Sequence, residues 1–564
     1  MTSVAPDAQA EKDGGATGAR PRRNVPLRKY GALAVVLTVV FLITVRHITL
    51  GEFDYNVDET QHAVTGLYVR DFLAHAPLAH PVQFTFAYYA QYPALSGVVH
   101  WPPFFYFVEG LVFLLLGPTV VTARLTVLLF ALTGACFCFR LVRELQDEWT
   151  ALAVTLALFL LPFVLLLEKS VMLDIPCLAL SMASTYYWVD YLRSLRPRSA
   201  YIAALYAGLA LLTKHNAVYL PVFFVMTLVM TRRWRLLFTK PLIKAAALGG
   251  LLAGPYYLVL YLVTWQSIGR FVSGTSTGPS RVARFLYYPA ALPEQVGWPI
   301  LFLSVVGILT RRWWVKTDTL AIILALIFSC YITFTLIGYK DPRYTLYWTP
   351  AFVLLAVGPL CAQYGSAAAR FASRAAVVLL LAFSLYQGWQ FRRPYVAGYE
   401  AVAREITSHH QECSFVLFDG ALPGNFIYFM RASDPERRFV VLRKALWVTN
   451  IIASAGEQEL IHSRAELEDL LRTYGVHYIV VDNSLPLLPV QTLLRTELKS
   501  DQFQLVRSFP VESNMRDWAG RKLLLYVNRK ASRPTAKEVR IKMLTMGHDI
   551  VVPTDAVLHG CIDR

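Results

Sequence analysis

Long apolar runs recur about every 30 residues between residues 30 and 391, and they constrain the fold of this chain more than any other feature. Hydrophobic residues make up 55% of its 564 residues and charged residues only 16%, whereas a soluble domain has about 25% charged residues. In lipid, a run of this kind satisfies its backbone polar groups by forming a helix. The pattern excludes a disordered chain, a coiled coil and an ordinary cytosolic enzyme, and it predicts a polytopic α-helical membrane protein.

Eleven apolar runs are predicted to cross the membrane, at residues 30–45, 121–139, 150–167, 172–192, 200–213, 216–230, 245–264, 296–310, 319–338, 345–361 and 375–391. Arginine and lysine cluster in every second loop and ahead of the first run. By the positive-inside rule those loops are cytoplasmic, and so is the N-terminal segment 1–29, which is predicted to be disordered. Two of the runs, 200–213 and 216–230, are short for a hydrocarbon core of about 30 Å.

An odd number of spans places the polar tail, residues 392–564, on the extracytoplasmic side. Its strand-like runs and one amphipathic helical pattern predict a small α/β domain; they lie at 415–418, 439–442, 477–481, 523–527 and, for the helix, 465–474. Because no nucleotide-binding glycine motif opens a helix there, an accessory or acceptor-docking role is expected. Two of the seven cysteines, Cys413 and Cys561, lie in this tail and are candidates for a disulfide if the tail is extracytoplasmic.

The net charge of +16 suggests nucleic acid binding in a soluble protein, but here membrane topology explains it. The basic residues stand in short loops between apolar runs, where the positive-inside rule expects them. We therefore expect the lipid bilayer, and no nucleic acid, as a partner.

The first outer loop, residues 51–120, is the most informative part of the sequence. Arg70 is its only lysine or arginine, against six aspartate and glutamate residues. Loops of this length in compact proteins are usually functional. The apolar run 104–116 within it is too short to span a bilayer, which predicts an interfacial helix along the membrane surface.

Short motifs follow one another in order along the first 390 residues: Val57–His62 (VDETQH), His100–Phe104 (HWPPF), Ala123–Leu125 (ARL), Glu168–Pro176 (EKSVMLDIP), Leu212–Lys214 (LTK) and Tyr339–Tyr344 (YKDPRY). With the topology, this order resembles the GT-C glycosyltransferases, and among them the protein O-mannosyltransferases and the aminoarabinose transferase that acts on lipid A. The resemblance implies transfer of a sugar from a polyprenyl-phosphate carrier to an acceptor hydroxyl. It also implies an active site on the outer side of a bacterial inner or plasma membrane.

By this resemblance the catalytic acidic residues are Asp58, with Glu59 beside it, and Asp174 in the second outer loop. With a phosphate as the leaving group, such a reaction needs a carboxylate to accept a proton and cations to hold the phosphate. Attack from the face opposite the phosphate would invert the anomeric configuration. Candidates for donor binding are the cations on the predicted outer face: Lys169, Lys214, Arg270, Lys340 and Arg343.

His100 and Trp101 precede the two prolines, where family members often have a charged residue. They are candidates for acceptor or sugar binding, and Asp58 and His100 are candidates for a divalent metal, although no close ligand spacing supports one. Simpler interpretations remain open: a solvated loop pair for Asp58 and Glu59, a helix cap for Asp174, and lipid head-group anchors for the cations.

Two other classes of function compete with an enzyme. A transporter or flippase usually shows internal repeats and charges at mid-membrane depth, and a non-catalytic receptor or envelope assembly factor would act through the tail. The acidic residues gather at outer ends of the predicted spans and no repeat is visible, which favours the enzyme. The sequence names neither the sugar nor the acceptor.

Overall fold

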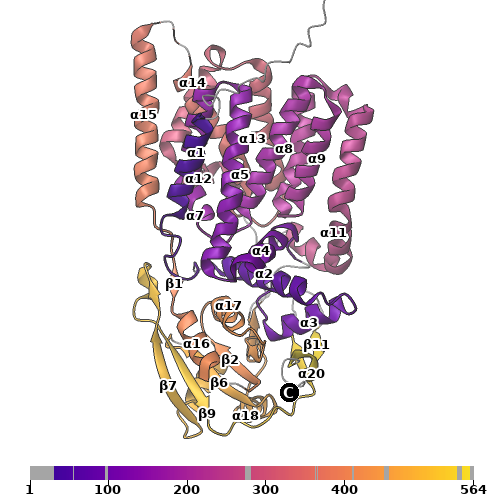
Figure 1. Ribbon diagram of the computed structural model, residues 1–564, viewed down its shortest axis with the longest axis vertical. Helices are drawn as coiled ribbons and strands as arrows, with labels where there is room; N and C mark the ends of the chain where they lie inside the picture. The colour runs from indigo at the N-terminus through magenta and orange to yellow at the C-terminus, as the bar shows by residue number, and fades with distance from the viewer. Residues whose placement is uncertain are drawn as a thin grey trace, which may run out of the picture.

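The computed structural model describes residues 31–54, 56–95, 100–273, 281–362, 364, 366–409, 412–449, 457–484, 486–542 and 549–558, with the side chains of 264–281 left out. Figure 1 shows three levels along the long axis. A bundle of roughly parallel helices lies at the top, the short helices α2, α3 and α4 lie across its lower end, and a part containing the β-strands lies at the bottom. The predicted N-terminal segment 1–29 lies outside the described residues.

The bundle contains helices α1 (Gly31–Val45), α5 (Val120–Leu145), α6 (Glu148–Phe159), α7 (Pro162–Glu168), α8 (Asp174–Ser194), α9 (Pro197–Leu211), α10 (Tyr219–Met230), α11 (Lys240–Ser273), α12 (Arg281–Leu309), α13 (Thr317–Leu336), α14 (Thr349–Cys361) and α15 (Ala367–Gln390). Helices α5 and α8 are largely buried by their neighbours, whereas α11 and α15 stand at the edges of the bundle. Both edge helices leave most of their apolar side chains exposed, as expected of helices that face lipid.

The predicted number of eleven spans is not confirmed. Among the described residues, six helices are long and apolar enough to cross a bilayer, or seven if α6 and α7, bent by 69° at their junction, form one broken span. Helices α9 and α10 have only 15 and 12 residues. At about 1.5 Å per residue they are shorter than a hydrocarbon core of about 30 Å.

Residues 51–120, the predicted first outer loop, contain three helices, α2 (Val57–His75), α3 (Pro81–Gln91) and α4 (Phe104–Leu116). Helix α4 occupies the residues predicted for the interfacial helix, and it exposes Leu114, Leu115 and Leu116. It packs closely on α2, where a Cβ atom added at Gly66 would lie 2.2 Å from Oε2 of Glu109. The loop is thus a packed helical layer rather than an extended connection.

The residues after 392 contain a five-stranded sheet in the order β3-β2-β6-β9-β7. Strands β3, β2 and β6 are parallel, and β9 pairs antiparallel with both β6 and β7. The strands are β1 (Val396–Ala397), β2 (Ser414–Asp419), β3 (Phe439–Leu442), β4 (Trp447–Thr449), β5 (Glu457–Glu459), β6 (Val476–Asp482), β7 (Phe503–Pro510), β8 (Glu512–Ser513), β9 (Lys522–Asn528), β10 (Glu538–Ile541) and β11 (Ile550–Pro553). The helices are α16 (Tyr399–His409), α17 (Pro423–Ser433), α18 (Arg464–Thr473), α19 (Pro489–Glu497) and α20 (Thr554–Val557).

The four predicted strand-like runs lie within β2, β3, β6 and β9, and the predicted helical pattern overlaps α18. Cys413 is disulfide-bonded, whereas the other cysteine of the tail, Cys561, lies outside the described residues.

Buried polar contacts hold the C-terminal segment against the first outer loop. Arg431 on α17 donates to the carboxylate of Asp71 on α2 at 2.8 Å, and both side chains are almost fully buried. On α3, the amide of Gln91 donates to the backbone carbonyls of Arg437 and Phe439 at 2.6 and 3.0 Å. Charged pairs buried in this way are costly to separate, so the segment is docked rather than loosely tethered.

Glu52 fastens the start of the first outer loop to α16. Its buried carboxylate accepts hydrogen bonds from the backbone N–H groups of Gly398, Tyr399 and Glu400, at 2.9 to 3.0 Å. These N–H groups open α16 and have no partner within the helix, so the carboxylate caps it.

The stability of the protein is expected to fall between pH 4.5 and 7 because of Glu52. Burial raises the pKa of its carboxyl to about 7, against the opposing effect of the three N–H donors. Because the native state then binds more protons than the unfolded chain in this range, the contribution of the group is present below pH 4.5 and lost as the pH rises through about 7. A shift of this size corresponds to about 3 kcal/mol.

Melting temperatures of the purified protein across this pH range test the prediction. The Glu52→Gln variant should show a flatter decline than the wild type, and equal slopes for both proteins would contradict it.

Candidate active site

Asp58 lies in the first turn of α2, at the junction between the loop helices and the bundle. Its backbone N–H donates to the side chain of Asn56, which caps the helix. Its carboxylate accepts from both Nη1 and Nη2 of Arg343, each at 3.3 Å, and about a third of the Asp58 side chain is exposed. Asp58 is therefore oriented by a guanidinium group and still accessible to a substrate.

Asp341 holds Arg343 more firmly than Asp58 does. The two residues surround the start of a short 3-10 helix, Pro342–Trp348, at the lower end of α14. Nη2 of Arg343 donates to Oδ2 of Asp341 at 2.8 Å, and the backbone N–H of Arg343 donates to Oδ1 at the same distance. Burial alone would raise the pKa of Asp341, but the hydrogen bonds and charge of Arg343 lower it overall, with help from Lys214.

Asp174 and Lys214 form a second, buried ion pair. Asp174 opens α8, and Lys214 follows α9. The two are joined by a hydrogen bond of 2.6 Å from Nζ to Oδ1, with side chains 4% or less exposed. Oδ2 of Asp174 has no hydrogen-bond partner among the described residues.

His62 links the two pairs electrostatically. Its pKa is lowered to about 3, chiefly by burial; the positive charges of Lys214 and Arg343 lower it further, while Asp174 opposes them. The ring is thus neutral, and its Nδ1 lies 2.7 Å from the hydroxyl of Tyr106 on α4. We call the group formed by Asp58, Asp174, Lys214, Asp341 and Arg343 the charged cluster.

Trp101 and His100 lie beside the charged cluster. The ring of Trp101 stacks on His215 at 5.6 Å and has Nζ of Lys214 5.9 Å from its centroid. The backbone carbonyl of His100 lies 2.8 Å from Nε2 of His215, and its ring meets that of Trp101 edge to face. An aromatic wall therefore borders the cluster on the side of Lys214.

Glu59 was predicted to act with Asp58 as a catalytic acidic residue, but its side chain does not face the charged cluster. It is fully buried, and both carboxylate oxygens accept hydrogen bonds from the protein. Successive residues of a helix point about 100° apart, so two adjacent carboxylates cannot serve one site from the same face.

Two of the five cations predicted to bind a donor lie in the charged cluster, Lys214 and Arg343. Nζ of Lys169 instead donates to backbone carbonyls at the end of α1, those of Ile43, Thr44 and Arg46. Nζ of Lys340 donates at 2.7 and 2.8 Å to the carbonyls of Phe334 and Thr335, at the end of α13. Helix ends carry unpaired carbonyls and partial negative charge, which explains where these two cations bind. The side chain of Arg270 lies outside the described residues.

Among the described residues, no group of three or more His, Cys, Asp or Glu side chains is arranged to hold a metal ion. Asp58 is engaged by Arg343, and Asp174 by Lys214. The predicted pair of Asp58 and His100 thus has no third protein ligand among these residues.

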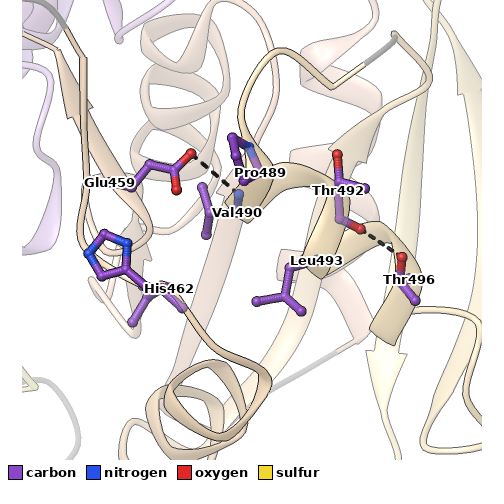
Figure 2. Close-up of a pocket in the computed structure, with 8 residues that line it drawn as sticks. Glu459, His462, Pro489, Val490, Thr492, Leu493 and Thr496 are labelled. Carbon is purple, nitrogen blue, oxygen red and sulfur yellow. Dashed lines mark hydrogen bonds between the residues drawn. The ribbon is translucent and has the colours of Figure 1, made fainter.

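A hollow of about 370 Å³ lies elsewhere, in the C-terminal segment. Figure 2 shows Glu459 and His462 on one side of it and the residues of α19 on the other. The carboxylate of Glu459 accepts a long hydrogen bond, 3.5 Å, from the backbone of Val490. The hollow shares no residue with the charged cluster, so it is not the candidate site.

Several residues at or beside the site were not predicted from the sequence. Asp341 lies in the motif Tyr339–Tyr344, from which only the two cations were predicted to have a role. His215 follows Lys214 directly, and Tyr106 lies three residues after the proline pair. Arg393, the partner of Glu59, is separated from it by 334 positions, and no local signal connects the two.

Long apolar helices define an integral membrane protein, and its fold is similar to that of the GT-C glycosyltransferases. A family model described as dolichyl-phosphate-mannose-protein mannosyltransferase matches residues 100–257. The resemblance predicted from the ordered motifs is thereby confirmed. No curated protein sequence matches the chain.

Among solved structures, the chain is similar to ArnT from Cupriavidus metallidurans bound to undecaprenyl phosphate, at 14% identity, with a TM-score of 0.58, over 90% of this chain and 99% of that one. It is also similar to the Archaeoglobus fulgidus oligosaccharyltransferase in complex with zinc and sulfate, at 13% identity and a TM-score of 0.51, over 79% of this chain and 68% of that one. A third similar structure is the arabinofuranosyltransferase AftD from Mycobacteria, at 15% identity and a TM-score of 0.50, over 91% of this chain and 42% of that one. At these identities the similarity shows a shared fold.

Proposed function

We propose that this protein is a glycosyltransferase that moves a sugar from a polyprenyl-phosphate donor to the hydroxyl of an extracytoplasmic acceptor, with inversion at the anomeric carbon. The observation that carries the proposal is the contact between the accessible carboxylate of Asp58 and the guanidinium of Arg343, beside the Asp174–Lys214 pair. A carboxylate and adjacent cations are what this reaction needs. The similar ArnT structure contains undecaprenyl phosphate, which supports the class of donor.

Arg343 and Lys214 would bind the phosphate of the donor. Arg343 presents two N–H groups toward Asp58, a geometry that also suits two oxygens of a phosphate. Lys214 supplies a second positive charge from the other ion pair.

Asp58 would act as the base. As the acceptor oxygen forms its bond to the anomeric carbon, its proton passes to the Asp58 carboxylate. The bond from the anomeric carbon to the phosphate oxygen breaks, and its electron pair leaves on the phosphate, where the cations stabilise it. Attack opposite the leaving group inverts the configuration, so Asp58 and Arg343 would separate around the sugar.

The structure supports an order of events, because Arg343 is shared by two carboxylates. Its contacts to Asp58 are 3.3 Å long, whereas it donates to Asp341 at 2.8 Å as well as at 3.1 Å. A donor phosphate would therefore displace Asp58 from Arg343 more readily than it would displace Asp341. Donor binding would free the Asp58 carboxylate for the acceptor.

A divalent metal was predicted as a possible cofactor, but the described residues form no site of three ligands for it. The carboxylates of the charged cluster already have cationic partners.

We propose that the charged cluster and the C-terminal segment face the exterior. Asp174 lies at one end of α8, and Arg193, paired with Glu144 at 2.7 Å, lies near the other end. Over the 21 residues of this helix the two ends are about 30 Å apart, so the cluster and the basic loops lie at opposite ends of the bundle. The positive-inside rule then places the basic end in the cytoplasm. The disulfide at Cys413 fits an oxidising exterior.

Incubation of the purified protein with a panel of polyprenyl-phosphate sugars tests the proposal. Release of lipid phosphate from at least one donor, with the sugar recovered on an acceptor hydroxyl in the opposite anomeric configuration, is expected. Movement of a lipid or sugar across proteoliposomes without release of lipid phosphate would instead indicate a transporter or flippase. Binding of envelope partners without either activity would indicate an assembly factor.

A further inference from the structure

The buried carboxylate of Glu59 ties together three parts of the chain around the proposed site. Oε2 accepts from the backbone N–H of Asp54, just before α2, at 2.5 Å. Oε1 accepts from the backbone N–H of Val171, in the turn before α8, at 2.9 Å. Nη1 of Arg393 donates to Oε1 and Oε2 at 3.1 and 3.2 Å.

These contacts connect two acidic residues of the charged cluster, Asp58 and Asp174. Glu59 follows Asp58 directly, so a shift of its backbone moves that of Asp58 too. Val171 precedes Asp174 by three residues, in the turn that leads into α8. The position of Asp58 relative to Asp174 thus depends on the carboxylate of Glu59, which is fully buried and does not contact the substrate.

Arg393 is the one charged partner of Glu59 among the described residues, and it belongs to the segment that leaves α15 for the C-terminal sheet. Its Nη2 donates to the backbone carbonyl of Glu52 at 2.9 Å. Its own carbonyl accepts from the side chain of Asn514 at 2.9 Å. Its side chain is 2% exposed. Arg393 therefore connects the C-terminal segment to the residues that precede α2.

We propose that Arg393 is a positioning residue for sugar transfer: through Glu59 it fixes the start of α2, and with it Asp58, against the turn before Asp174. This inference rests on the proposed function and deepens it. It gives the C-terminal segment a part in the geometry of the reaction, beyond any docking of an acceptor. Cutting the chain near residue 392 would remove Arg393, so truncation cannot separate a catalytic bundle from an accessory tail.

The test uses the full-length protein and a double variant in which both charges of the ion pair are removed. Arg393→Met alone leaves the Glu59 charge buried without its partner, so it risks misfolding. The double variant Glu59→Gln with Arg393→Met removes both charges and keeps a side-chain oxygen for a backbone donor. The control is Arg431→Met, which breaks the other buried ion pair between α2 and the C-terminal segment, at Asp71, but leaves Asp71 a second cationic partner, Arg70, at 2.6 Å.

We expect the double variant to lose about 100-fold in kcat, because a displacement of about 1 Å in a reacting group has an effect of this size. Its dissociation constant for undecaprenyl phosphate should stay that of the wild type, because Arg343 and Lys214 are intact. Arg431→Met should lower the melting temperature and leave kcat unchanged. Arg393→Lys should retain more kcat than Arg393→Met, because it keeps a positive charge beside Glu59.

Three results would overturn the inference: wild-type kcat in the double variant, an equal loss of kcat in Arg431→Met, or a loss of phosphate binding in parallel with kcat. A wild-type protein that releases lipid phosphate from no donor is a different outcome, because it overturns the proposed function itself.

Discussion

Replacement of Asp58 by asparagine is expected to reduce sugar transfer by about 1000-fold, the usual scale for loss of a general base. Asparagine has nearly the same shape but cannot accept the proton of the acceptor hydroxyl. Because Arg343 would lose one of its two carboxylate partners, binding of undecaprenyl phosphate should stay the same or become tighter. Both quantities are measured on the same purified protein, as initial rates of lipid phosphate release and as an equilibrium titration.

The matched control for Asp58→Asn is Asp190→Asn. Asp190 lies near the other end of α8, where it accepts a hydrogen bond from Ser199. This substitution makes the same chemical change far from the charged cluster, and wild-type turnover is expected. Normal turnover by Asp58→Asn would remove Asp58 from the role of base.

Replacement of Arg343 by methionine should weaken donor binding and transfer together. Loss of a hydrogen-bond donor that stabilises a departing oxyanion typically lowers kcat by about 100- to 1000-fold, or about 2.7–4 kcal/mol. Here the loss should appear in kcat/KM for the donor and in the affinity for undecaprenyl phosphate, because the guanidinium would contact the phosphate before and during transfer.

Lys340→Met provides a control three residues away. Nζ of Lys340 is engaged by carbonyls at the end of α13, so its loss should lower the melting temperature without changing donor affinity. If both variants lost donor affinity equally, Lys340 would regain the donor-binding role predicted from the sequence, and the distinction between cluster cations and helix-end cations would be wrong.

Much of the fold was predictable because it depends on local pattern. The residues predicted for an interfacial helix form α4 with the same bounds, and the strand-like runs fall within β2, β3, β6 and β9. A short continuous apolar run is typical of a buried strand, as in the fully buried β2 and β3, and an apolar run of 13 residues indicates a helix too short to span. The number of spans was not predictable in this way, because helices buried by other helices and helices that face lipid have similar compositions.

The candidate site was predictable in part. Asp58, Asp174, Lys214 and Arg343 were identified from ordered motifs, and the structure brings them together. Lys169 and Lys340 stand in the same motifs but satisfy helix carbonyls. A motif shows which residue types are available, but it does not show which acceptor each cation reaches.

The sequence alone determined that the chain is a membrane protein, the order of its motifs and the acidic character of its first outer loop, since these depend on composition along the chain. Tertiary structure decided the pairings. Arg343 meets Asp58 across 285 positions, and Arg393 meets Glu59 across 334. Contacts at such separations depend on how helices pack, because side chains one residue apart point to different faces and reach different partners.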